Sequence, residues 1–168
     1  MLGTRKTGPY KIIGDMIPEI YQFAAQNGIQ IIGPQMYIYH ETNVEDATKA
    51  DNERNADVEV AVPILKRCKE TDEISCYELP SAKMVKTVHK GPYREEGATY
   101  EKLFVWLEKN NKTIMGPMRE IYLNDPHAVS EEGLLIEIYT PIVGGLFRFL
   151  SGSAFSFFFF NSCARFLY

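Results

Sequence analysis

Glu137 is a carboxylate with apolar and aromatic neighbours in a segment that we expect to be a strand. Across residues 135–139 the side chains alternate between two faces, so Leu135, Glu137 and Tyr139 share one of them. A carboxylate that is partly removed from water attracts a cation strongly, because the local dielectric is low. The segment therefore predicts a cation-binding acid beside a tyrosine. The alternative is that Glu137 faces water on the open side of an antiparallel sheet.

Aromatic side chains could complete such a site with flat faces for stacking and for cation–π contact. Trp106 lies one flank away from the apolar stripe of an expected helix, which leaves its ring free to line an adjacent groove. Glu59 holds the matching place in an earlier segment, but Ala61 follows it instead of a tyrosine, so we expect it to be solvated or to support the site indirectly. For the rings the alternative is ordinary core packing. The candidate ligand-binding residues are Glu137, Tyr139, Trp106, Tyr122, Tyr39, Tyr37 and Glu59.

The sequence lacks the patterns of metal, cofactor and most catalytic sites. Its 3 histidines are scattered, with no spacing typical of a metal site. No Gly-x-Ser-x-Gly elbow, phosphate loop or dinucleotide fingerprint occurs. We therefore expect no metal, no cofactor, and a binding protein rather than an enzyme. A single acid with a tyrosine could still perform general acid–base hydrolysis, so a hydrolase that uses Glu137 stays open as an alternative.

Composition narrows the partners and the compartment. A formal net charge of −4 argues against nucleic acid as a direct partner, because the neutralisation of phosphates needs a clustered basic face. The 3 cysteines cannot all pair within one chain, and the N-terminus has no secretory signal. We therefore expect a reducing, cytoplasmic environment.

The elements that must position these residues occur twice in the chain. The anchors Gly-Pro-Tyr, Gly, Asn, Gly-Pro and Tyr recur at a constant offset of 83 residues. A closing Glu-x-x-x-Pro-Ile segment recurs at an offset of 78, because the first copy has a longer loop. A duplicated unit predicts one domain, 1–142, made of two similar modules, residues 1–65 and 74–142, with a ligand-binding cleft between them.

Each copy is expected to fold as strand, helix, strand, strand. In the first copy we expect Asp15 to cap the helix, so that Pro18 falls in the first turn. The order predicts an α+β fold of two pseudo-twofold modules, with antiparallel sheets and a helix packed on each. In the second copy the expected strands are 83–89, 119–122 and 134–140, and the apolar helix stripe is Tyr100, Leu103, Phe104 and Leu107.

Three segments depart from this duplicated plan. Residues 41–56 are polar and long for a hairpin, so we expect a mobile loop. The first copy begins almost at Met1, so we expect its first strand to be incomplete. Residues 143–168 are rich in phenylalanine, and we expect them to be foreign to the domain. The alternatives for them are a weak membrane-surface anchor or an added core element.

The duplicated anchors resemble the GyrI-like family, the effector-binding domain of multidrug-responsive transcription regulators and of stand-alone gyrase-inhibitor-like proteins. The resemblance covers Leu2 to Ile142 through the repeated Gly-Pro-Tyr turn, the amphipathic helix, Gly-Pro and the closing Glu-x-x-x-Pro-Ile strand. It implies two strand-helix-strand-strand modules around a cleft that takes flat or cationic organic molecules. It also implies that Glu137, which matches an acidic residue of the family's closing strand, lies in that cleft among aromatics.

The leading hypothesis is a stand-alone protein that senses or sequesters a small amphipathic, aromatic or cationic compound between its modules. No helix-turn-helix segment occurs, so we do not expect a complete transcription regulator. Two alternatives follow from the resemblance: a protein-interaction role such as inhibition of DNA gyrase, and hydrolysis of strained xenobiotic compounds with Glu137. Membrane contact is expected only if the phenylalanine-rich segment is native to the domain.

Overall fold

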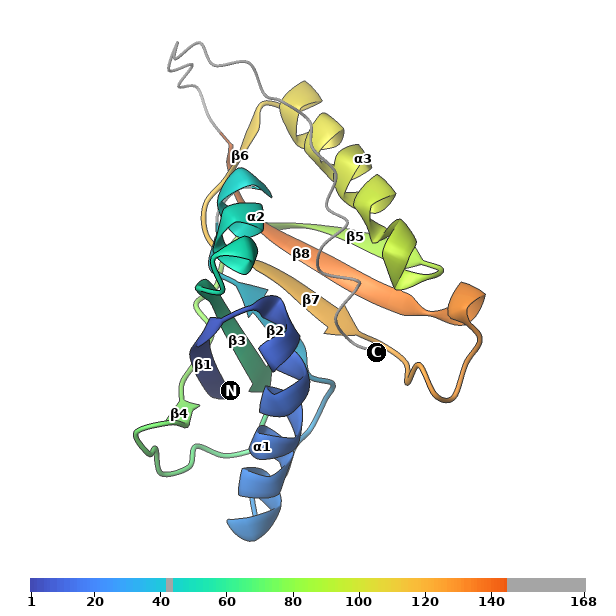
Figure 1. Cartoon of the computed structure of the whole chain (residues 1–168). Helices are drawn as coiled ribbons and strands as arrows, with labels where there is room; N and C mark the ends of the chain where they lie inside the picture. Colours follow the sequence, from blue (N-terminus) through green and yellow to red (C-terminus); the bar gives the residue numbers. More distant parts are fainter. Residues whose placement is uncertain (42–43, 145–168) are drawn as a thin grey trace.

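The computed structural model describes residues 1–41 and 44–144, which form an α+β fold with an open, eight-stranded antiparallel sheet (Figure 1). The expected fold class is confirmed, and the strands of both halves join one continuous sheet. The strands are β1 (Leu2–Gly8), β2 (Met36–Tyr39), β3 (Ala56–Val62), β4 (Ser75–Cys76), β5 (Met84–Lys90), β6 (Lys112–Ile114), β7 (Met118–Tyr122) and β8 (Leu135–Gly144). The α-helices are α1 (Ile13–Gln26), α2 (Val44–Asn52) and α3 (Glu96–Lys109), with short 3-10 turns at Tyr10–Ile12, Tyr93–Glu95 and Glu131–Gly133.

The central strands β2 and β7 join the N-terminal half of the sheet to the C-terminal half. The strand order is β4-β1-β3-β2-β7-β8-β5, and β6 pairs with the end of β8. In the central pair Tyr37 lies opposite Glu120, and these residues are 83 positions apart, so they are counterparts in the repeat. The pseudo-twofold axis of the repeat therefore passes between Tyr37 and Glu120.

The same offsets relate the outer strand pairs. Thr4 pairs with Val60 in the first half, and their counterparts Thr87 and Ile138 pair in the second half. A single row of neighbours thus crosses the sheet symmetrically on the face that the helices cover. The row runs Thr4, Val60, Tyr37, Glu120, Ile138, Thr87.

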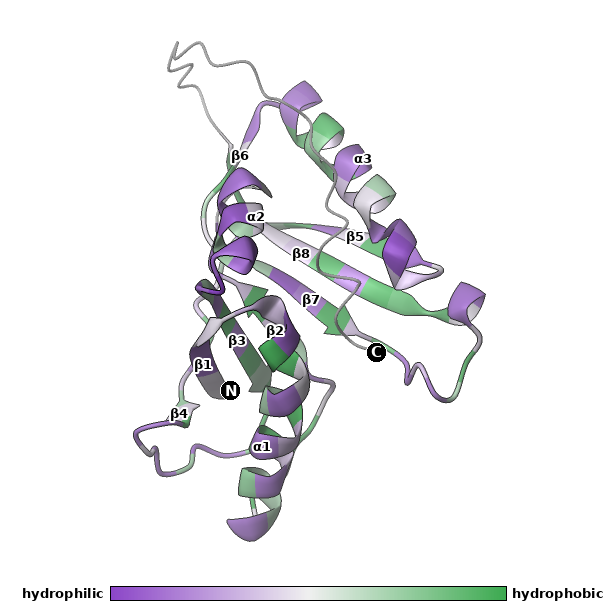
Figure 2. Ribbon diagram, in the orientation of Figure 1, coloured by the Kyte–Doolittle hydropathy of each residue, from purple (hydrophilic) through white to green (hydrophobic). Residues whose placement is uncertain are grey.

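Helices α1 and α3 pack on the same face of the sheet, one over each half (Figure 1). In Figure 2 both helices alternate between hydrophilic and hydrophobic residues, as expected of helices that bury one side. Tyr122 packs against both of the resulting core clusters. One cluster includes Ile13, Met16, Ile20, Val58, Val60 and Val62, and the other includes Tyr100, Leu103, Leu107, Ile136 and Ile138.

Both long helices end in the same way, as the repeat predicts. Asn27 and Asn110 are their C-terminal caps. The next residues, Gly28 and Asn111, have φ angles of 63° and 50°. A left-handed residue at this position ends a helix while its last carbonyl groups still receive hydrogen bonds.

The expected start of the first helix is wrong. Helix α1 begins at Ile13, directly after the 3-10 turn, so Asp15 lies in its first turn and Pro18 inside it. A proline there removes one intrahelical hydrogen bond and crowds the preceding turn. The early turn is nevertheless stabilised, because Ile13 and Met16 are buried in the core.

Two other expectations for the first half are wrong. The polar segment 41–56 contains helix α2, in which Ala47 packs in the core and Asp51 Oδ1 accepts a hydrogen bond of 2.9 Å from the Tyr10 backbone N–H. These contacts hold a helix whose composition alone suggested a loop. The first strand is also not shortened, since β1 has 7 residues, as β5 does, and pairs with β3 from Leu2 to Gly8.

The expectations for the phenylalanine-rich segment fall outside the described residues from position 145 onward. Its first two residues, Val143 and Gly144, complete β8 and pair with Thr113 and Lys112. Among the described residues, no helix is long and apolar enough to cross a membrane.

The burial pattern predicts that one isoleucine of β8 is far more important for stability than an isoleucine at the surface. Ile138 is fully buried and Ile32 is 55% exposed. Ile138→Ala should lower the free energy of unfolding by about 2–5 kcal/mol, because it removes apolar contacts and leaves a cavity. Ile32→Ala should change it by about 0.5 kcal/mol or less. Urea unfolding of both variants measures the difference, and equal losses would contradict the described core.

Candidate ligand-binding site

Glu120 lies at the centre of the helix-covered face of the sheet, and its side chain is fully buried. Strand alternation places it there, since Met118 and Tyr122, two residues away on either side, pack in the core. Tyr37 lies opposite Glu120 on β2 and belongs to the core of the first half, as does Tyr39. The structure thus brings Tyr37, Tyr39 and Tyr122, three of the expected site residues, together around an acid.

Three tyrosine hydroxyls donate hydrogen bonds to the Glu120 carboxylate. Tyr39 donates to Oε2 at 2.8 Å, Tyr122 to Oε2 at 3.2 Å, and Tyr100 of α3 to Oε1 at 2.5 Å. Hydrogen bonds to a charged acceptor are stronger than those between neutral groups. They offset part of the free energy needed to remove the carboxylate from water.

The surrounding rings form two symmetric pairs. Tyr10 and Tyr39 meet edge to face, with ring centroids 5.6 Å apart and an interplanar angle of 78°. Their counterparts Tyr93 and Tyr122 are 5.3 Å apart at 69°. The Tyr37 ring adds to the second pair, since it lies 4.6 Å from that of Tyr122. Burial raises the pKa of Tyr37 to about 12, so this phenol stays neutral at physiological pH.

A second buried acid, Glu96 in the first turn of α3, lies beside Glu120. Glu96 is 4% exposed, and among the described residues its Oε1 has no hydrogen-bond partner. Burial, and then the charge of Glu120 and a hydrogen bond to it, raise the pKa of Glu96 well above its ordinary value of 4.5. Burial also raises the pKa of Glu120, although the tyrosine hydroxyls oppose this. Two adjacent buried carboxyls cannot both ionise easily, and the tyrosine hydroxyls favour Glu120 as the acid that ionises.

Glu137 and Tyr139 lie on the opposite face of the sheet from Glu120. The expected alternation is confirmed, since Ile136 and Ile138 are fully buried and Glu137 is not. Lys86 Nζ donates to Glu137 Oε1 at 2.8 Å and the Tyr139 hydroxyl donates to Oε2 at 2.6 Å. These hydrogen bonds lower the pKa of Glu137, whose side chain is 18% exposed and covered mainly by surface side chains.

The last two expected residues lie apart from both groups. Glu59 is on the same outer face as Glu137, where Oε1 accepts a hydrogen bond from the Tyr77 hydroxyl and Oε2 lies 3.0 Å from His40 Nε2. Burial alone would raise the pKa of Glu59, but the hydrogen bonds from His40 and Tyr77 lower it overall. Trp106 is 44% exposed on α3 and belongs to neither core cluster.

Sequence reasoning missed Glu120, Glu96 and Tyr100. The segment from Met118 to Tyr122 reads as a half-exposed strand, in which an acid is expected to face water. One available signal was the repeat itself, because the offset of 83 aligns Glu120 with Tyr37. An acid that aligns with an aromatic residue in a duplicated strand indicates a buried position. At such a position the acid of the second copy is expected to have a role other than facing water.

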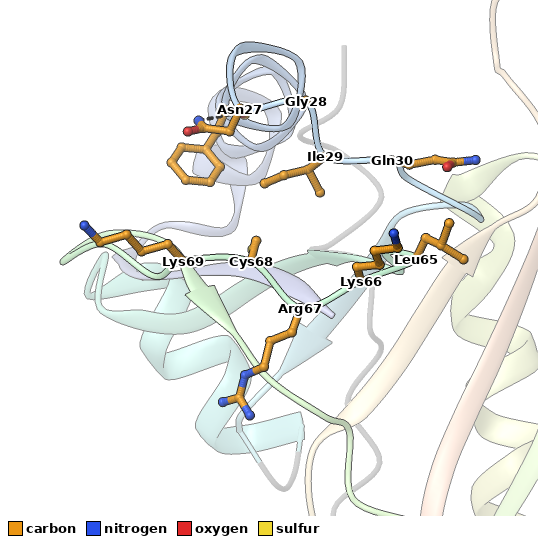
Figure 3. A pocket seen from close by; sticks show the side chains of 10 residues that line it. Asn27, Gly28, Ile29, Gln30, Leu65, Lys66, Arg67, Cys68 and Lys69 are labelled. Carbon is orange, nitrogen blue, oxygen red and sulfur yellow. Dashed lines mark hydrogen bonds between the residues drawn. The ribbon is translucent and has the colours of Figure 1, made fainter.

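Two cavities formed by described residues lie away from Glu120. One, of about 460 Å³, lies between the end of α1 and residues 65–69 (Figure 3). In Figure 3 Ile29 and Cys68 point toward each other across this space, whereas Arg67 extends away from α1. It contains none of the expected site residues and no buried polar group in need of a partner, so we assign it no role. The other, of about 260 Å³, lies on the outer face and is lined in part by Glu59.

Metal binding finds no support in the part of the chain that the structure describes. Within residues 1–41 and 44–144, no three or more His, Cys, Asp or Glu side chains come together as a group that could hold a metal ion. Cys68 and Cys76 are free thiols, and the Cys68 backbone N–H donates to Cys76 Sγ at 3.1 Å.

Comparison with known families gives one match over nearly the whole described chain. The model of the GyrI-like small molecule binding domain matches residues 1–143. No protein with a curated description matches the sequence significantly.

Comparison with solved structures supports the same fold. The C-terminal domain of EcmrR has a TM-score of 0.73 at 23% identity, over 86% of this chain and 90% of that one. EcmrR in a DNA complex has a TM-score of 0.70 at 23% identity over 84% of this chain, which spans 52% of that one. An uncharacterized conserved protein from Listeria innocua has a TM-score of 0.61 at 14% identity, over 84% of this chain and 86% of that one. At these identities the likeness shows the fold.

The raised pKa of Glu96 predicts how stability depends on pH. Because this pKa is higher in the folded state, stability should fall as the pH rises above about 4.5, until the folded pKa is passed. Glu96→Gln can still donate to Glu120 but has no proton to lose, so its stability should decline less with pH. Urea unfolding between about pH 4 and pH 8 measures both curves.

The control for this test is Glu108→Gln, which alters an exposed acid on the same helix. Its curve should follow that of the wild type. The account of the two buried acids would be wrong if Glu96→Gln declined as steeply as the wild type, or if it were less stable at neutral pH by more than about 1 kcal/mol.

Proposed function

The chain belongs to the GyrI-like small-molecule-binding family, and we propose that it binds flat aromatic or amphipathic cations at Glu120, between modules 1–65 and 74–142. The carboxylate of Glu120 would recognise the positive charge. The rings of Tyr37, Tyr39 and Tyr122 would contact the aromatic body. This is a binding function, through which the protein would sense or sequester its ligand.

The observation that supports a cationic ligand most strongly is the uncompensated charge of Glu120. None of the ion pairs among the described residues involves this carboxylate. Its partners are neutral hydroxyls, which reduce the free energy of burying a charge but do not cancel the charge. A ligand cation would neutralise the charge of Glu120 in a medium where Coulomb attraction is much stronger than in water.

The tyrosines support a flat ligand. Their rings present π-faces and edges in two groups near the acid, one that includes Tyr39 and one that includes Tyr37 and Tyr122. An aromatic cation gains both stacking and cation–π attraction from such rings. Tyr122 has the longest of the three hydrogen bonds to Glu120, at 3.2 Å, and its hydroxyl is the donor most easily replaced by a ligand.

The position of Glu120 on the pseudo-twofold axis supports a site shared by both modules. Tyr39 comes from the first half, Tyr100 and Tyr122 come from the second, and all three donate to the same carboxylate. Tyr122 also packs against both core clusters. A ligand that replaced its hydroxyl would therefore alter the packing of both core clusters. Such a change is a means by which binding could be sensed.

The proposal is tested by removing the charge of Glu120 without changing its shape. N-methylacridinium serves as the cationic probe, and N-methylacridone as a neutral probe of similar size. Glu120→Gln should weaken N-methylacridinium binding by about 1.5 kcal/mol or more, roughly tenfold or more in Kd, because the Coulomb attraction between two close charges is lost. Binding of N-methylacridone should change little. Isothermal titration calorimetry measures both affinities.

Glu137→Gln is the matched control, since it makes the same substitution on the opposite face of the sheet. It should leave both affinities unchanged. If Glu137→Gln weakened N-methylacridinium binding while Glu120→Gln did not, recognition would belong to the outer face and the proposal would be overturned.

A further inference from the structure

The outer face of the sheet has a cavity of about 260 Å³ under the connection between the two halves. Its floor is formed by side chains of the central strands, including Ile38 and Arg119. Its cover comes from residues 77–82 between β4 and β5, including Tyr77 and Leu79. The volume is close to the lower end of the range for small-molecule pockets, about 300–1,000 Å³.

Arg119 is a buried cation in this cavity, and its side chain has no strong hydrogen-bond acceptor among the described residues. Arg119 is 8% exposed, and its Nε is buried without a hydrogen-bond partner among the described residues. Within residues 1–41 and 44–144, its one hydrogen-bond contact is from Nη1 to the Met84 thioether at 4.0 Å, and a thioether is a weak acceptor. No ion pair among the described residues includes it. Burial accordingly lowers the pKa of Arg119.

Glu59, the acid in the same cavity, is already engaged. Its two carboxylate oxygens are occupied by the Tyr77 hydroxyl and by His40 Nε2. In the row of strand partners, Ile38 stands between Glu59 and Arg119. Neighbouring strands are about 4.8 Å apart, which puts the two backbones about 10 Å apart. The cavity therefore has a free donor group and an acceptor group that is satisfied.

Apart from Arg119, Glu59 and the His40 and Tyr77 side chains that contact Glu59, the lining is apolar. Leu79, Pro80, Met115, Pro117 and Pro141 surround the space beside Ile38. The sheet residues among them come from both halves of the chain, because β2, β7 and β8 all contribute. A molecule that fitted here would need one acceptor group for the guanidinium and a small hydrocarbon body for the remaining walls.

From this combination we propose that the outer-face cavity is a second binding site, which takes a small carboxylate with an apolar body. Arg119 donates to the carboxylate, as guanidinium groups do in planar, often bidentate geometry. Ile38, Leu79 and Pro141 contact the body. The site is separate from Glu120, which faces the other side of β7 one residue further along.

Benzoate is the probe, and benzamide, which has the same shape without the charge, is its neutral control. Benzoate should bind saturably to the whole chain labelled with ¹⁵N and should shift the Arg119 Nε–H resonance. Benzamide should bind about tenfold more weakly or worse, since the charged acceptor is lost. Sodium chloride at the same ionic strength should produce no such shift.

Variants then assign the binding to this cavity. Arg119→Met should weaken benzoate binding by about tenfold or more, whereas Arg94→Met, at an exposed arginine paired with Glu131, should not. Removal of a buried unpaired charge is not expected to unfold the protein, and thermal unfolding checks this. If the variant did unfold, the Arg119 Nε–H shift of the wild type would still show whether benzoate binds at Arg119.

Glu120→Gln should bind benzoate as the wild type does, which separates this proposal from that of the cation site. The proposal is overturned if benzoate leaves the Arg119 resonance unmoved up to its solubility limit. It is equally overturned if folded Arg119→Met binds benzoate as well as the wild type does.

Discussion

The antiparallel pairing of β2 with β7 is the constraint on which the rest of the molecule depends. It is the join between the two halves of the sheet, and it sets Tyr37 against Glu120, its own counterpart in the repeat. A slip of β7 by one residue in this register would reverse its faces relative to β2 and would bring Arg119 under the helices in place of Glu120. The core, the ring pairs and the position of the acid all follow from this one register.

Strand β7 holds two buried ionisable groups of opposite sign at successive positions. Glu120 faces the helices among hydroxyl donors, and Arg119 faces the outer cavity, where the Met84 thioether is its one hydrogen-bond contact in the described part of the chain. Neither belongs to an ion pair among the described residues. Burial of a charge without a partner is unfavourable, so such groups are more readily explained by a bound partner than by stability. The repeat supports this reading, since their counterparts are Tyr37 and Met36, which have no charge to bury.

Much of the fold could be predicted from the sequence because the duplication is strong. The constant offset located both helices, their Asn caps and the closing strands, and the strand registers agree with the same two offsets. Helix α2 and the early start of α1 could not be predicted, because they depend on contacts between distant residues, such as Asp51 with the Tyr10 backbone. Such contacts cannot be predicted from local composition.

The sequence led to several of the aromatic residues around Glu120 but not to that acid, and ligand binding by all of them stays a prediction. Tyr37, Tyr39 and Tyr122 do lie together. Glu137 was chosen because of its aromatic neighbour, whereas Glu120 is distinguished by burial and by tyrosines from three different elements, β2, α3 and β7. Alternation tells which residues share a face of a strand, but it does not tell which face a helix will cover.

The most direct test of the central claim is a crystal structure of the protein with N-methylacridinium bound. We expect the ligand on the helix-covered face, with its charged ring against the Glu120 carboxylate and in stacking contact with Tyr122. The Tyr122 hydroxyl should have left Glu120 Oε2. A ligand bound instead on the outer face beside Glu137 and Tyr139, with the tyrosine group around Glu120 unchanged, would contradict the account.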